Sequence, residues 1–116
     1  HTLYKRNVQD TRVNRWTRKM TLRDAFALSV NVFFGKLGLF YVGPEKLIRY
    51  AERFHFNHPI RADVPVQTGY AKIAPEDPWS VVTAASGFTL DNTMSPLHGA
   101  MIAAAVANDG VMMEPY

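Results

Sequence analysis

Apolar residues recur at helical spacing through the stretch that follows residue 20. Repeats at i, i+3, i+4 and i+7 predict a helix with one apolar face, and Phe26, Phe33 and Phe40, together with Phe54, are expected in the core. Thr21 and Asp24 mark the start of the helix as a capping box, in which the hydroxyl accepts from an early backbone N–H and the carboxylate reaches back to the cap. The recurring positions are Leu22, Ala25, Phe26, Val32, Phe33, Leu37 and Phe40, with the polar Ser29 at the same spacing.

Two further helices are predicted from their start signals. Pro44 suits a first helical position, and the apolar stripe that follows it ends near Phe56. Ser95 as N-cap and Pro96 at the first position open the last helix, and Gly110, which can adopt a left-handed conformation, closes it.

The other segments lack a sustained period. Residues 1–20 are expected to form an extended or irregular basic lead-in with room for one short element, and residues 57–79, rich in Pro, a long connecting loop. The apolar run 79–85 taken alone fits a helix or a strand, and residues 80–110 as a whole are expected to be helical. Residues 111–116 are expected to begin a strand.

Composition places the chain among globular proteins. At 116 residues with 47% hydrophobic content it fits one domain or a piece of one. It has no apolar stretch of about 18 residues, so this segment is not expected to span a membrane. Because Cys is absent, disulfides, thiolate zinc sites and thiol catalysis are excluded.

No cofactor or metal is predicted. His55 and His58 have the spacing of two ligands on a helix, but Pro59 follows at once and no carboxylate stands at helical spacing, which favours a pair of loop histidines. A Gly-rich phosphate cradle is missing too.

The net charge of +3 conceals a basic first fifth of the chain. A basic arm suits a polyanion or a partner protein, yet no nucleic-acid-binding motif accompanies it, so no nucleic-acid partner is predicted. A non-enzymatic helical interaction module remains an alternative function. The basic residues are Lys5, Arg6, Arg12, Arg15, Arg18, Lys19 and Arg23, opposed only by Asp10.

Ser29 and Asn31 interrupt the most apolar part of the first helical stretch. In an unbroken helix, residues two apart lie about 200° from one another, so the two side chains would not serve one site. If one helix ends near Leu28 and the next begins near Val32, both side chains can leave a turn in the same direction. A simpler reading, that Ser29 or Asn31 only caps a helix, stays open.

Residues 20–38, which run from Met-Thr-Leu-Arg-Asp-Ala through Ser-Val-Asn, resemble the region around the second motif of penicillin-binding protein transpeptidases. Residues 43–54 are similar to the helix that follows in that family, and residues 94–112 to a later one. The resemblance covers 20–56 and 79–116. It implies a mainly α fold, the helical lobe of the β-lactamase/transpeptidase-like fold, with long irregular connections and little strand.

The resemblance also assigns roles. In that family a Ser-x-x-Lys nucleophile, a Ser-x-Asn turn and a Lys-Thr-Gly strand meet at one cleft. By this resemblance Ser29 would relay a proton beside the lysine, and Asn31 would hydrogen-bond that lysine and an amide carbonyl of the substrate. The implied partners are peptidoglycan stem peptides, β-lactams and the remaining segments of the same domain.

Two of the three motifs are not found in the chain. No Ser is followed three residues later by Lys, and Gln67-Thr68-Gly69 has Gln in place of Lys within a loop rich in Pro. The stretch 85–89 departs from the Gly-Gln-Gly type of sequence common in the family. The chain is therefore expected to be one partial domain, with helices around Ser-x-Asn in residues 21–56, and inactive alone. The intact protein is expected outside the bacterial inner membrane, held there by an N-terminal anchor that this chain lacks.

Overall fold

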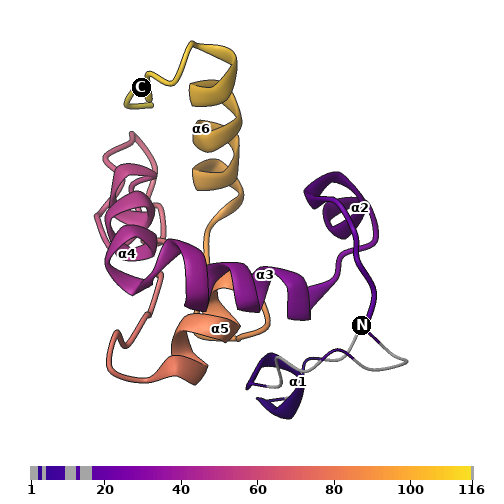
Figure 1. The fold of residues 1–116 in the computed structure, drawn as a ribbon. Helices are drawn as coiled ribbons and strands as arrows, with labels where there is room; N and C mark the ends of the chain where they lie inside the picture. The colour runs from indigo at the N-terminus through magenta and orange to yellow at the C-terminus, as the bar shows by residue number, and fades with distance from the viewer. Residues whose placement is uncertain (1–2, 4, 10–12, 14–16, 116) are drawn as a thin grey trace. The chain divides into compact units, whose positions relative to one another are not determined.

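The computed structural model of this chain describes residues 3, 5–9, 13 and 17–115. Within them the only β-type pairing is an isolated antiparallel bridge between Tyr70 and Thr93, so the expected mainly α architecture is confirmed (Figure 1). The elements in chain order are α1 (Lys5–Gln9), α2 (Leu22–Ala27), α3 (Asn31–Leu37), the π-helical turn η1 (Gly38–Val42), α4 (Pro44–Arg53), α5 (Pro78–Ser86) and α6 (Pro96–Ala107).

The chain divides into two compact units. The first joins residues 1–44 to residues 73–89, and the second joins residues 45–72 to residues 90–116. Among the described residues, no helix combines the length and the apolar content that crossing a bilayer requires.

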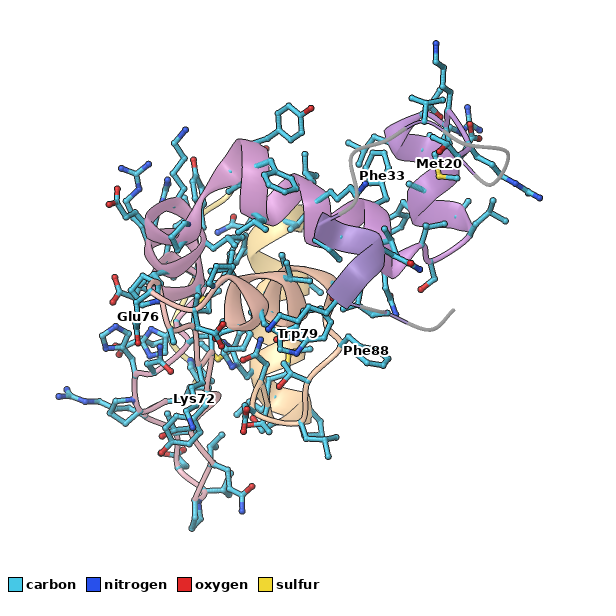
Figure 2. All side chains as sticks on the ribbon, turned by 60° about the horizontal axis from the view of Figure 1, so that its bottom comes forward. Met20, Phe33, Lys72, Glu76, Trp79 and Phe88 are labelled. Atoms are coloured by element: carbon cyan, nitrogen blue, oxygen red, sulfur yellow. The ribbon has the colours of Figure 1, made fainter. Side chains whose placement is uncertain are left out.

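The core of the first unit lies where α3 packs on α5. Leu3, Val8 and Val82 are buried together, and Trp79 packs against them (Figure 2). A Cβ built on Gly35 of α3 would lie 2.9 Å from Val82 Cγ1 of α5. Because a glycine removes that overlap, α3 and α5 approach closely at this point, and the packing fixes the position of α3 in the unit.

Helix α5 settles the ambiguous apolar run in favour of a helix. The Asp77 carboxylate caps it by accepting from the Trp79 backbone N–H at 2.9 Å, and Pro78 occupies the first turn. At the other end Gly87 adopts a left-handed conformation with φ of 67°. These are local start and stop signals of ordinary type.

Helix α4 begins at Pro44 as expected but ends at Arg53, before the predicted end near Phe56. His55 and Asn57 both have left-handed backbones, with φ of 66° and 64°, which stop the helix there. Glycine is the usual signal for a helix end of this kind, and neither position has one. The sequence therefore carries no sign that the helix stops before Phe56.

The segment after α4 is irregular but firmly attached within the second unit. The Asn57 backbone N–H donates to the Gly69 carbonyl at 2.7 Å. Its side chain imitates a β-bridge, because Nδ2 donates to the Ala71 carbonyl at 3.2 Å and Oδ1 accepts from the Ala71 N–H at 3.0 Å. Tyr70 and Thr93 then exchange two backbone hydrogen bonds of 2.8 and 2.9 Å.

His98 of α6 is the buried polar residue of the second unit. Its side chain is 0% exposed, and Nε2 lies 2.7 Å from the Phe54 carbonyl oxygen, to which a protonated Nε2 donates. The ring packs on Phe56 with centroids 4.6 Å apart, while Nδ1 has no hydrogen-bond partner among the described residues. A Cβ on Gly69 would reach 2.7 Å from His98 Cε1, so only glycine allows this loop to lie against the imidazole.

Helix α6 follows its predicted signals. The Ser95 hydroxyl accepts from the His98 backbone N–H at 3.2 Å, Pro96 starts the helix, and Gly110 has a φ of 85° after the end. Residues 111–115 have no regular structure, and the strand start expected there stays a prediction.

The basic lead-in contains α1, the short element for which the sequence left room. Of its charged residues, Asp10, Arg12 and Arg15 lie outside the described residues, as does Tyr116 at the other end.

Replacing Gly35 by Ala is expected to destabilise the protein by about 1 to 3 kcal/mol, because the new methyl group overlaps Val82 Cγ1. Thermal or urea unfolding measures the change. Gly99→Ala in α6 is the matched control: its Cβ would lie 3.9 Å from Met94 Sδ, an ordinary contact, so a gain of about 0.5 to 1 kcal/mol is expected.

The double variant Gly35→Ala/Val82→Ala separates overlap from helix propensity. Val82→Ala removes the overlapping methyl, so the penalty of Gly35→Ala should shrink in that background. Equal penalties in both backgrounds would show that α3 and α5 do not meet at Gly35.

Candidate active-site turn

The break between α2 and α3 is built by backbone hydrogen bonds. The Leu28 N–H bonds to the Asp24 carbonyl at 2.9 Å, and the Ser29 N–H then turns to the Phe26 carbonyl at 3.0 Å. The Val30 N–H reaches back to the Ala25 carbonyl at 3.0 Å. Ser29 itself is left-handed, with a φ of 50°. This residue and the hydrogen bonds donated by Ser29 and Val30 together form a Schellman motif.

Helix α3 starts immediately afterwards. Its first residue is Asn31 and its N-cap is Val30, whose carbonyl accepts from Phe33 at 3.0 Å and from Phe34 at 3.4 Å. The predicted break is therefore confirmed, and it lies one residue closer to the N-terminus than expected, since α2 ends at Ala27 and α3 begins at Asn31. Because Ser29 and Asn31 do not share one continuous helix, the 200° separation does not apply to them.

Neither polar residue caps the second helix. Val30 holds the N-cap position, and no side chain makes a capping hydrogen bond there. Ser29 is exposed, and its hydroxyl has no hydrogen-bond partner among the described residues, whereas Asn31 is half-buried. Neither side chain therefore caps α3. Ser29 does end α2, because its left-handed backbone fills the C′ position of the Schellman motif, so the capping explanation holds for its backbone and gives its hydroxyl no role.

The left-handed conformation of Ser29 is costly for a residue with a Cβ. That region costs an L-residue roughly 1 to 2 kcal/mol, and Gly normally fills this place in a Schellman motif. Non-glycine residues in such regions concentrate at functional sites, where the neighbouring structure holds them in place. The strain at Ser29 therefore marks the turn as a candidate site.

An aromatic contact spans the turn. The rings of Phe26 in α2 and Phe34 in α3 meet edge to face with centroids 6.4 Å apart, and Phe33 meets Phe34 in the same way at 5.6 Å. Such pairs contribute about 0.5 to 1.5 kcal/mol beyond the area that they bury. They tie the two helices together across Ser29.

The expectation that the aromatic stripe is core is wrong for most of its members. Phe26 is 78% exposed, Phe40 53% and Phe54 39% within this chain. Helical spacing reports a common apolar face, but burial depends on which segments lie against that face.

His55, His58 and Gly69, which the sequence did not favour as site residues, make contacts within the fold. His55 Nε2 lies 3.1 Å from the Pro59 carbonyl oxygen, and the His55 and His58 rings are 5.6 Å apart. In the part of the chain that is described, no three His, Cys, Asp or Glu side chains gather as a metal site would need. Gly69, at the end of Gln67-Thr68-Gly69, is buried against His98.

The match to known families covers nearly the whole chain. A model of the penicillin binding protein transpeptidase domain matches residues 2–116. The chain therefore belongs to the penicillin-binding protein transpeptidase family, as the Ser-x-Asn turn and its flanking helices indicated.

Three curated relatives carry the same protein name. The peptidoglycan D,D-transpeptidase PbpA of Mycolicibacterium smegmatis is 35% identical over 97 residues, which is 84% of this chain and 19% of that protein. PbpA from two strains of Mycobacterium tuberculosis is 33% identical over the same coverage. The chain thus spans about a fifth of the length of these relatives. No solved structure gives a significant match.

Replacing Ser29 by Gly is expected to stabilise the protein by about 0.5 to 1 kcal/mol, because Gly adopts a φ of 50° without the Cβ penalty. Ser29→Ala keeps the penalty and should leave stability almost unchanged. Thermal unfolding of the two variants beside the parent compares them directly. If Gly at this position proves less stable than Ala, the residue is not left-handed.

Proposed function

We propose that this chain supplies the Ser-x-Asn wall of the active site in a peptidoglycan D,D-transpeptidase. The single observation that carries the proposal is the exposed hydroxyl of Ser29, which has no hydrogen-bond partner among the described residues and sits on a left-handed residue two positions before α3 in a chain of this family. The D,D-transpeptidase name of the PbpA relatives supports the reaction type.

The proposed chemistry is acyl transfer through a serine ester. The nucleophilic serine attacks an amide carbonyl of a stem peptide, forms the ester, and expels an amine that must gain a proton. The lysine of the Ser-x-x-Lys motif takes the proton that the nucleophile loses, and the Ser29 hydroxyl accepts a proton from that lysine while it donates its own to the leaving nitrogen. This reaction uses side chains alone and needs no cofactor.

Asn31 suits a bridging role. Its carboxamide oxygen can accept from a lysine ammonium while its NH₂ donates to a carbonyl, so one side chain can orient both base and substrate. A position at the first residue of α3 holds the side chain on an element that Gly35 and Val82 pack firmly. A rigid support of this kind is what a positioning group requires.

The remaining parts of the site are proposed to come from other segments of the same protein. A Ser-x-x-Lys helix would bring the nucleophile and its lysine, and a Lys-Thr-Gly strand would close the cleft. The exposed apolar side chains of Phe26 and Leu28 beside the turn fit a surface covered by such segments. The intact protein would then work on the outer side of the inner membrane, anchored by an N-terminal segment, with stem peptides and β-lactams as ligands.

Fluorescent penicillin tests the roles of the pair in the full-length protein. Ser29→Ala and Asn31→Ala are each expected to lower the acylation rate constant by about 10²- to 10⁴-fold, the usual contribution of proton transfer and positioning. The rate of label incorporation at several drug concentrations gives that constant. The 116-residue chain alone should not label.

Ser29→Gly and Gln67→Ala are the matched controls. Ser29→Gly keeps the turn but lacks the hydroxyl, so it should be as slow as Ser29→Ala although it is more stable. Gln67→Ala alters the exposed loop residue that superficially resembles the third motif and should label at the parent rate. Normal labelling of folded Ser29→Ala would contradict the proposed role.

A further inference from the structure

Helix α2 is too short to be stable by itself. It has six residues, of which only Ala25 is buried, whereas isolated helices need about 12 to 15 residues to form in water. Segments with few buried contacts open locally at low free-energy cost. The Ser29 turn is the last part of this helix, so it persists only while α2 is formed.

The N-terminal end of α2 is closed by two side chains. The Thr21 hydroxyl accepts from the Asp24 backbone N–H at 3.1 Å, and the same hydroxyl donates to the Asp24 carboxylate Oδ2 at 2.7 Å. This differs from the capping box expected from sequence, in which the carboxylate would bind the backbone N–H of the cap residue. The carboxylate instead orients the hydroxyl, which leaves an oxygen lone pair directed at the backbone.

Asp24 also belongs to the other end of the helix. Its carbonyl accepts from the Leu28 N–H at 2.9 Å, immediately before Ser29. The next carbonyls, of Ala25 and Phe26, accept from Val30 and Ser29 in the Schellman motif. The cap and the Ser29 turn are therefore separated by a single helical turn, and Asp24 takes part in both.

We infer that Thr21 and Asp24 are positioning residues for Ser29, acting through α2 to hold its left-handed backbone and hence the direction of its hydroxyl. The inference rests on the proposed role of Ser29 in proton transfer. Loss of the cap lets α2 fray, and the fraction of molecules with a formed Ser29 turn falls. The acylation rate then falls in proportion to that fraction.

The effect of each change has a definite size. Loss of a Thr N-cap costs a helix about 2- to 30-fold in its folding equilibrium, so Thr21→Ala should slow acylation by up to that factor without weakening the initial binding of penicillin. Thr21→Ser retains both hydrogen bonds and should label at the parent rate.

Asp24→Ala should lower the acylation rate less than Thr21→Ala does, and Asp24→Asn, which keeps an acceptor oxygen, should recover most of that rate. Arg23→Ala, an exposed neighbour outside the cap, is the matched control.

A double-variant cycle in the full-length protein distinguishes positioning from general destabilisation. In a Ser29→Ala background there is no hydroxyl to position, so adding Thr21→Ala should cost little further acylation rate. Amide hydrogen exchange supplies a second measurement that is independent of activity. The Ser29 and Val30 N–H groups should exchange faster in Thr21→Ala, whereas the amides of α5 should not change.

Different outcomes test the proposed role of Ser29 and the positioning role of Thr21 and Asp24. If Ser29→Ala acylates normally, the proposed function fails. If Ser29→Ala is slow but Thr21→Ala labels at the parent rate, or lowers the rate equally with and without the hydroxyl, only the positioning inference fails. Unchanged exchange at Ser29 and Val30 in Thr21→Ala would also overturn it.

Discussion

The reversal of backbone handedness at Ser29 is the constraint on which the candidate site depends. A right-handed helix that continued through this residue would send Ser29 and Asn31 to nearly opposite sides. Hydrogen bonds from Ser29 to Phe26 and from Val30 to Ala25 end α2 instead, and α3 starts at the next residue. The strain of a left-handed serine is offset by these bonds and by the Phe26–Phe34 contact.

Each unit contains a close contact between a glycine backbone and a side chain. In the first unit Gly35 lets α3 settle on Val82 of α5, which fixes the helix that carries Asn31. In the second unit Gly69 lies against the buried ring of His98, whose Nε2 in turn meets the Phe54 carbonyl after α4. Both glycines serve by lacking a Cβ, although neither has a left-handed backbone.

Helix starts were predictable, whereas helix ends and burial were less so. Thr21, Pro44 and Ser95 open their helices as expected, because capping depends on hydrogen bonds between residues three or four apart. The early end of α4 depends on the left-handed backbone of His55, a residue with no strong preference for that conformation. The residues of the aromatic stripe are divided among several elements, and Phe26 remains 78% exposed within this chain.

The sequence by itself determined the family, the Ser-x-Asn motif and the local signals that open each helix, since these rest on neighbouring residues. Only the structure decided that Ser29 is left-handed, with a hydroxyl that has no hydrogen-bond partner in the described part of the chain, that Val30 rather than either polar residue caps α3, and that His98 is buried. The burial of His98 depends on Phe54 and Gly69, which lie far from it in the sequence and which only folding brings within hydrogen-bonding or van der Waals range. The Ser29 turn is made by local hydrogen bonds to Phe26 and Ala25, but the residue types do not reveal it, because serine has no preference for a left-handed backbone.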